Sequence, residues 1–141
     1  MPSSFTLTLI KPDAVAAGHT GKILQHICQA GFRITAMKMV HLSEQQAGQF
    51  YAVHRERPFY SDLVRFMTSG PVVAAVVSGE NAVERFRELI GATNPAQAAE
   101  GTIRKLFGQS VERNAVHGSD SEANAEREAA FFFSELERFN L

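Results

Sequence analysis

The chain of 141 residues contains one cysteine, Cys28, and no tryptophan, and several other features are missing from it. A single cysteine excludes a disulfide within the chain, which favours a reducing compartment. No apolar run approaches the roughly 18 residues of a membrane-spanning helix. The start of the chain, "MPSSFTLTLIKPDA", does not have the basic and then apolar order of a secretory signal. We therefore expect a cytoplasmic protein with no membrane as partner.

An excess of charge of one sign is also missing, because the formal net charge is -1 at pH 7. This balance gives no electrostatic reason to expect nucleic acid as an obligate partner. Hydrophobic residues make up 45% of the chain and charged residues 21%, which is typical of a globular protein. A chain of this length is expected to form one domain, spanning residues 1–141, with a proper hydrophobic core.

The hydrophobic pattern predicts a mixed α/β chain in which helices alternate with a few strands. Ser43 and Ser119 each precede a Gln or Glu by three residues, which is the spacing of a capping box at a helix start. Asn81 is the expected N-cap of a further helix. Residues 92–116 show few periodic cues, and segments this long without regular structure are usually functional or disordered. The predicted strands are 4–10, 32–42 and 71–77, and the predicted helices are 21–31, 43–54, 60–70, 81–91 and 119–133.

No glycine-rich phosphate-binding loop occurs, because neither G-x-x-x-x-G-K-[ST] nor G-x-G-x-x-G is present. A nucleotide-binding protein of this kind would need side-chain cations for its phosphates. Lys11 at a strand end, Arg87 on a helix and Arg104 in the irregular segment are candidates, and the planar guanidinium suits phosphate oxygens. Taken singly, each of them is more typical of a solvated surface residue.

Six short segments, in register, resemble the nucleoside diphosphate kinase family in its compact bacterial form. The resemblance runs from Phe5 to Phe133, almost the whole chain. It rests on matched strings and not on composition. The segments are "IKPDAV" (10–15), "RPFY" (57–60), "MTSGPVV" (67–73), "GATNP" (91–95), "GTIR" (101–104) and "NAVHGSDS" (114–121).

The resemblance implies a ferredoxin-like α+β fold, with a four-stranded antiparallel sheet covered by helices. The fourth strand would lie at "NAVH", which is too short for periodicity to reveal. It also implies an enzyme that moves the γ-phosphate of a nucleoside triphosphate to a nucleoside diphosphate and so maintains nucleotide pools. The transfer would be ping-pong, through a phosphohistidine on His117, with little base specificity.

A lone histidine beside glycine is ordinarily a surface turn residue, so His117 gains its meaning from the other motifs. A neutral imidazole is a nucleophile without a separate base, and it needs an acceptor to orient it. By resemblance that acceptor is Glu128, and Ser119 hydrogen-bonds around the pair. Glu126 competes for the role, but Glu128 shares a helix face with Ala125 and Phe132, which favours it.

The resemblance assigns the remaining site residues one by one. Apolar stacking of the base would explain low base specificity, because every base has a π-face. Mg²⁺ is the implied cofactor, held mainly by the nucleotide phosphates and water, with no residue assigned as a metal ligand. The assignments are Lys11 to the ribose hydroxyl and the transferring phosphate, Tyr51 beside the catalytic histidine, Arg87, Thr93 and Arg104 to the phosphates, Asn114 to the ribose 3′ hydroxyl, and Phe59 with Leu63 to the base.

The chain departs from the family at "GTIRKLF", where Lys105 and Leu106 replace a small residue and an aspartate. This affects how the segment is anchored and how it meets a neighbouring subunit. Family members are tetramers or hexamers, and sometimes dimers, so a homo-oligomer is expected. Two other interpretations stay open: a non-catalytic histidine phosphocarrier or regulatory domain, and a ferredoxin-like domain that binds a small molecule.

Overall fold

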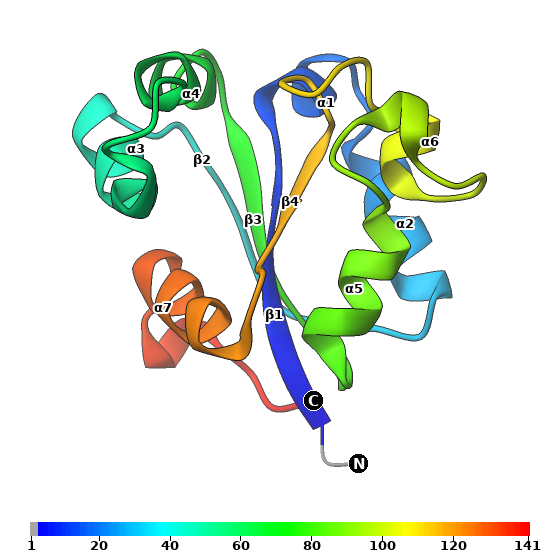
Figure 1. Ribbon diagram of the computed structural model, residues 1–141. Coiled ribbons are helices and arrows are strands. Elements are labelled where there is room, and N and C mark those ends of the chain that lie inside the picture. The colour runs from blue at the N-terminus through cyan, green and yellow to red at the C-terminus, as the bar shows by residue number, and fades with distance from the viewer. Residues whose placement is uncertain (1–2) are drawn as a thin grey trace.

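A computed structural model, which describes residues 3–141, contains one antiparallel sheet with the strand order β2-β3-β1-β4 (Figure 1). The central pair is in continuous register from Ser3 opposite Glu80 to Ile10 opposite Val73. β2 pairs with β3 and carries an irregularity between Ile34 and Ala36. The four strands are β1 (Ser3–Ile10), β2 (Arg33–Val40), β3 (Val72–Glu80) and β4 (Val116–Gly118).

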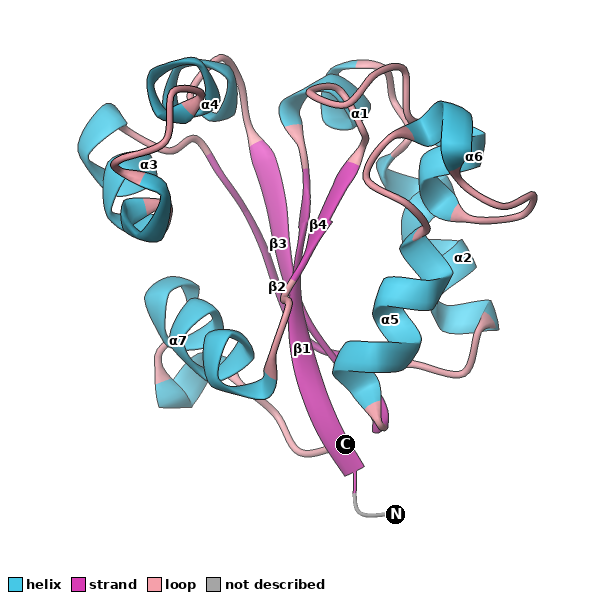
Figure 2. Cartoon of the chain, in the orientation of Figure 1, coloured by secondary structure: helices cyan, strands magenta, loops and turns pink. Residues whose placement is uncertain are grey.

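Helices cover both faces of this sheet, which gives three layers (Figures 1 and 2). One face packs against α3 (Glu44–Phe50), α4 (Tyr60–Met67) and α7 (Glu122–Phe132). The other packs against α1 (Pro12–Ala16), α2 (Thr20–Gln29), α5 (Ala82–Ile90) and α6 (Ile103–Phe107). Three short 3-10 helices lie between these elements or after them: η1 (Ala52–His54), η2 (Pro95–Gln97) and η3 (Glu135–Glu137). Within the described residues, none of the helices has the length and apolarity needed to cross a membrane.

The two central strands are buried on both faces, because each face has its own hydrophobic core. Leu7 and Leu9 of β1 belong to one core, and Ile10 belongs to the other. The apolar run of β3, "VVAAVV", is what a doubly covered strand requires. The predicted α+β sheet is confirmed, including the fourth strand beside β1.

Of the three predicted N-cap residues, Ser43 and Asn81 lie at the N-cap positions of their helices, and Ser119 does not. Ser43 caps α3 in a full capping box with Gln46, as predicted. Ser119 does not cap α7: Ser121 does, accepting a hydrogen bond from the backbone N–H of Asn124 at 3.1 Å. Asn81 occupies the N-cap position of α5 with a φ of 48°, but its side chain donates to Glu84 and does not cap the helix.

Candidate functional site

His117 is positioned by β4, a strand of three residues that pairs with the end of β1. Leu9 is its partner across the ladder, and the Thr8 hydroxyl donates to the His117 carbonyl oxygen at 2.7 Å. The backbone of His117 is therefore bonded to a strand that is covered on both faces of the sheet. Its side chain is 21% exposed, so part of the ring remains open.

The ring of His117 is held by a buried carboxylate. Its Nε2 lies 2.8 Å from Oε1 of Glu128 on α7, and the Glu128 side chain is 7% exposed. The Ser119 hydroxyl, fully buried, donates to the same oxygen at 2.7 Å and accepts from the Leu7 backbone N–H at 3.3 Å. A carboxylate accepts hydrogen bonds, so the neutral imidazole carries its proton on Nε2, pointing to Glu128, and has its lone pair on Nδ1.

From the sequence, Glu126 and Glu128 are both candidates for the acceptor that orients His117, and they differ in the structure. Glu128 is buried and bonded to His117, whereas Glu126 is exposed. The displaced cap explains the third member of the group. Because Ser121 caps α7, Ser119 is free to bond Glu128.

A hollow of about 200 Å³ lies against the imidazole, and we call it the His117 hollow. Tyr51 lines it with a buried hydroxyl that has no hydrogen-bond partner in the described part of the chain. Burial, and then the negative charge of Glu128, raise the pKa of Tyr51, so this hydroxyl stays protonated and can donate. The lining residues are Phe50, Tyr51, Val53, His54, Arg87, His117, Gly118, Asp120, Asn124, Arg127 and Glu128.

A second hollow of about 320 Å³ shares Arg87 with the first, and we call it the arginine hollow. Thr93 and Arg104 also line it. Arg104 is anchored by donating to the carbonyl oxygens of Gly91 at 3.0 Å and Val116 at 2.9 Å. Burial and the charge of Arg87 lower the pKa of Arg104 to about 10, which leaves it cationic at neutral pH. Three residues predicted to bind phosphate therefore meet at one place.

Lys11 and Asn114 form a buried pair that is bonded to Thr93 of the arginine hollow. Lys11 Nζ donates to Asn114 Oδ1 at 2.8 Å, and Asn114 Nδ2 donates to the Thr93 carbonyl oxygen at 3.0 Å. Burial first, and the Arg104 charge second, lower the pKa of Lys11 to about 8. An ammonium group is kept here although its surroundings disfavour it, which is typical of a functional site.

Phe59 and Leu63 are less closely joined to the histidine. They lie at the start of α4, and neither lines the two hollows. Phe59 is 49% exposed and contacts His54, which does line the His117 hollow, with ring centroids 5.5 Å apart. Leu63 is half-buried against the core.

Sequence reasoning gave no site role to seven residues that line the His117 hollow: Phe50, Val53, His54, Gly118, Asp120, Asn124 and Arg127. The Phe50 ring packs edge-on against His117 with centroids 5.6 Å apart, and Arg127 Nη2 lies 3.5 Å from the outer oxygen of Glu128. Asp120 lies inside the "HGSDS" string, and Arg127 directly precedes Glu128, so adjacency to recognised residues was a usable signal. His54 lies outside the recognised strings, and nothing in its neighbours in the chain marks it.

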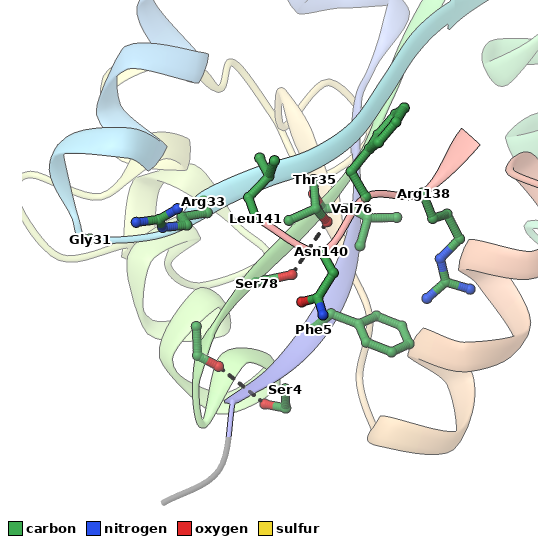
Figure 3. A pocket seen from close by; sticks show the side chains of 12 residues that line it. Ser4, Phe5, Gly31, Arg33, Thr35, Val76, Ser78, Arg138, Asn140 and Leu141 are labelled. Atoms are coloured by element: carbon green, nitrogen blue, oxygen red, sulfur yellow. Dashed lines mark hydrogen bonds between the residues drawn. The ribbon is translucent and has the colours of Figure 1, made fainter. Parts of the chain in front are cut away.

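A larger hollow, of about 490 Å³, lies at another part of the sheet, and Figure 3 shows residues that line it. It is formed by the ends of β1, β2 and β3 together with the C-terminal segment, and includes Arg33, Arg138 and Asn140. None of the predicted site residues lines it. Its size alone does not make it the functional site, since Tyr51, with its unpartnered hydroxyl, lines the His117 hollow and Arg104, with its lowered pKa, lines the arginine hollow.

A histidine hydrogen-bonded to a buried carboxylate, next to a hollow that shares Arg87 with a second, arginine-lined hollow, is the arrangement expected of a phosphotransferase. Comparison with known proteins agrees. A sequence profile named "Nucleoside diphosphate kinase" matches residues 4–138. The chain belongs to the nucleoside diphosphate kinase family.

The curated relatives include nucleoside diphosphate kinases of Chlamydia muridarum and Persephonella marina. They are 60% and 56% identical over 135 and 132 residues, with 96% and 94% of this chain covered, and the same shares of the relatives. Among solved structures, the Aquifex aeolicus enzyme has a TM-score of 0.96 at 49% identity, covering 98% of this chain and 100% of that one. The Halobacterium salinarum enzyme, solved in complex with CDP, has a TM-score of 0.95 at 38% identity, covering 99% and 93%. Proteins of this family bind nucleotides and use a divalent cation.

Proposed function

We propose that this phosphotransferase works through His117, which takes the γ-phosphoryl group of a nucleoside triphosphate and passes it to a nucleoside diphosphate. The observation that carries the proposal is the 2.8 Å contact between His117 Nε2 and Glu128, beside a hollow that shares Arg87 with the arginine hollow. The proton on Nε2 leaves the Nδ1 lone pair as the nucleophile. The same geometry serves both halves of a ping-pong reaction.

In the first half-reaction a bond forms between Nδ1 and the γ-phosphorus, and the bond from that phosphorus to the bridging oxygen breaks. The diphosphate leaves, and a second diphosphate then attacks the phosphohistidine in reverse. Phosphoryl transfer is accelerated mainly by positioning and by stabilisation of charge on the phosphate oxygens. Arg87, Arg104 and Lys11 supply that positive charge, Thr93 adds a hydroxyl, and the neutral Tyr51 hydroxyl is a donor beside the ring.

We propose that two separate groups of residues recognise the nucleoside, one at the ribose and one at the base. Asn114 and Lys11, already bonded to each other, would contact the ribose hydroxyls. Phe59 is exposed enough to offer its ring face to a base, with Leu63 beside it. A stacking surface does not read base edges, so we expect little preference among bases. The CDP complex of the Halobacterium salinarum relative supports nucleotide binding in this fold.

Mg²⁺ is the divalent cation that we propose. Within the described residues, no group of three or more His, Cys, Asp or Glu side chains could hold a metal ion. Mg²⁺ keeps much of its water and is often bound through one carboxylate and substrate phosphates. Asp120 is the exposed carboxylate of the His117 hollow, and one of its oxygens accepts a hydrogen bond from the Asn124 side chain. When bound, the ion would neutralise charge on the phosphates. The residues present fit an ion that arrives with the nucleotide.

We also propose that residues 1–141 act as a single domain in a cytoplasmic homo-oligomer, a tetramer or hexamer or else a dimer. The single cysteine supports a reducing compartment. The edge strand β2 supports association, because Met37 and Met39 are 53% and 59% exposed on it.

The deciding experiment follows phosphate from labelled ATP to dTDP. The unaltered protein should form an acid-labile phosphoenzyme and then dTTP. His117→Ala should form neither, because it lacks the attacking nitrogen, and His41→Ala is the control, since His41 contacts the Thr68 carbonyl oxygen away from the site.

The same experiment separates the alternatives. A phosphocarrier would be phosphorylated by a partner protein and would not transfer phosphate between free nucleotides. A ferredoxin-like binding domain would form no phosphoenzyme at all. Phosphoenzyme in His117→Ala would show that another residue is the acceptor and would refute the proposal.

A further inference from the structure

The chain turns sharply just before His117. Ala115 has a φ of 76°, which a residue with a Cβ rarely adopts. The Val116 backbone N–H donates to the Asn114 carbonyl oxygen at 2.9 Å, two residues earlier. A bond of this span with a positive φ at the central residue is the rare and strained form of the γ-turn.

This turn joins three residues of the proposed mechanism. Asn114 is the first residue of the turn, and its side chain is bonded to Lys11. His117 directly follows Val116, the last residue of the turn. Ala115 is fully buried, so its backbone groups must find partners inside the protein. Its carbonyl oxygen accepts from the Lys11 backbone N–H at 2.8 Å.

The remaining group of Ala115, its N–H, is satisfied by a side chain inside the "IKPDAV" string to which the resemblance assigns no role. It donates to Asp13 Oδ2 on α1 at 3.1 Å, a buried contact between residues 102 positions apart. The other oxygen, Oδ1, is buried without a partner in the described part of the chain. A buried carboxylate that is only half satisfied is costly. Its presence indicates a task other than overall stability.

We propose that Asp13 is a positioning residue for phosphoryl transfer: its carboxylate holds the strained turn at Ala115 and thereby aims His117 and Asn114. The proposal rests on the proposed function of His117. Without this acceptor the buried N–H of Ala115 would be unsatisfied, and the backbone would relax out of the left-handed region. Shifts of about 1 Å in a reacting group can cost a hundredfold in rate.

A carboxylate in the first turn of a helix has an ordinary explanation, since it interacts with the helix dipole. Asp13 is the second residue of α1, and Glu44, the first residue of α3, also lies in the first turn of its helix. Glu44 is exposed, whereas Asp13 is 9% exposed and bonded across the molecule. Glu44→Ala is therefore the matched control.

The test compares Asp13→Asn, which keeps an acceptor oxygen, with Asp13→Ala, which has none. We expect Asp13→Ala to lower kcat for ATP and dTDP by about tenfold to a hundredfold, and Asp13→Asn to stay within about fivefold of the parent. Glu44→Ala should have the parent kcat. Adding Ala115→Gly to Asp13→Ala should recover at least about threefold, because glycine tolerates a positive φ.

The rescue by Asn and by Ala115→Gly is what a purely structural role would not give. An Asp13→Ala protein that is folded and as active as the parent overturns the proposal, as does an Asp13→Asn protein as slow as Asp13→Ala. Should Asp13→Ala not fold, the Ala115 amide signal in NMR spectra decides. It should move more than its neighbours between the parent and Asp13→Asn, and an unchanged signal overturns the proposal.

A failure here is distinguishable from failure of the proposed function. If the parent protein forms no phosphohistidine, the function of His117 is refuted. If the parent forms it and Asp13→Ala forms it equally fast, only the role of Asp13 is refuted.

Discussion

At the residue scale, the site keeps charges where burial opposes them. Lys11 is 8% exposed, and Arg104 adds a second positive charge near it. Asp13 and Glu112 act in the other direction and raise the pKa of Lys11, but burial dominates, and the pKa is about 8 in place of 10.5. The folded protein therefore binds the proton on Lys11 less tightly than the unfolded chain does.

The first prediction concerns stability and its dependence on pH. A pKa lowered from 10.5 to about 8 corresponds to on the order of 3 kcal/mol against folding while Lys11 is charged. Lys11→Met removes this cost and loses the hydrogen bond to Asn114, worth about 1 kcal/mol. We expect the variant to be more stable than the parent by on the order of 2 kcal/mol at pH 7, although it should be nearly inactive.

The sign of the pH dependence follows from proton counts. Between about pH 8 and 10.5 the unfolded chain holds a proton on Lys11 that the folded state has lost, so raising the pH favours folding of the parent. The advantage of Lys11→Met should therefore shrink across this interval. Urea unfolding at pH 7, 8.5 and 10 measures it, and a variant less stable than the parent at pH 7 would contradict the prediction.

The second prediction concerns the aim of His117. Glu128→Gln keeps an oxygen near Nε2 but removes the charge that fixes the proton there, and the amide competes for the Ser119 hydroxyl. We expect phosphoenzyme formation to slow by about tenfold to a hundredfold, with smaller loss in Ser119→Ala. Glu126→Gln, on the exposed side of the same helix, is the control. Rapid-quench measurement with labelled ATP checks this, and equal rates for the two Gln variants would refute the role of Glu128.

At the scale of the elements, the end of α5 sets the position of Arg104. Gly91 follows the helix with a φ of 88°, and a Cβ built there would lie 2.6 Å from the Thr102 Oγ1. Its carbonyl oxygen also accepts from Arg104 at 3.0 Å. Glycine is thus needed at this position both for its backbone angle and for the close approach of the next element.

The third prediction compares two glycines. Gly18 also has a positive φ, 81°, but nothing lies within 4 Å of its built Cβ. Gly18→Ala should therefore lose only the backbone term, about 1 kcal/mol, whereas Gly91→Ala adds the overlap with Thr102 and should lose about 2–4 kcal/mol. Only the second should also weaken nucleotide binding. Thermal unfolding and nucleotide titration measure both effects, and equal losses would contradict the explanation.

The sequence predicts the elements where they are long and periodic. The runs at β1, β2 and β3 and five of the helices (α2, α3, α4, α5 and α7) are visible in the sequence because a covered strand and an amphipathic helix leave a pattern. β4 has three residues and no pattern of its own, and its existence came from the resemblance. The cap of α7 was misassigned because "SDS" offers two serines, and the choice between them depends on where Glu128 lies in space.

At the scale of the whole molecule, the fold gathers site residues that the sequence spreads from Lys11 to Glu128. The motif strings contain seven of the eleven predicted site residues, and Tyr51, Leu63, Arg87 and Glu128 lie outside the strings. The strings do not predict which residues line which hollow: Arg87 lines both hollows, and Phe59 lines neither. Asp13 lay inside a recognised string, but its contact with Ala115 crosses 102 positions, and no local spacing predicts such a contact.

The last prediction concerns association between copies of the molecule. β2 is an edge strand of the sheet. Within residues 3–141, the backbone of the C-terminal segment bonds to this strand at one point, where the Phe139 N–H donates to the Thr35 carbonyl oxygen at 3.0 Å. The two methionines beyond that contact present exposed apolar surface next to unpaired backbone groups. An edge of this kind is either protected or used for pairing. We expect Met39→Lys to shift the protein toward smaller assemblies, because it places a charge in the apolar strip.

Met39→Leu is the matched control, since it keeps an apolar side chain of similar volume. Light scattering after size exclusion gives the mass of each species across a range of concentrations. Met39→Leu should elute as the parent does. A Met39→Lys protein with the parent's mass, at low as well as high concentration, would exclude this edge as the contact and would direct attention to Leu106, which is 54% exposed where the family usually has an aspartate.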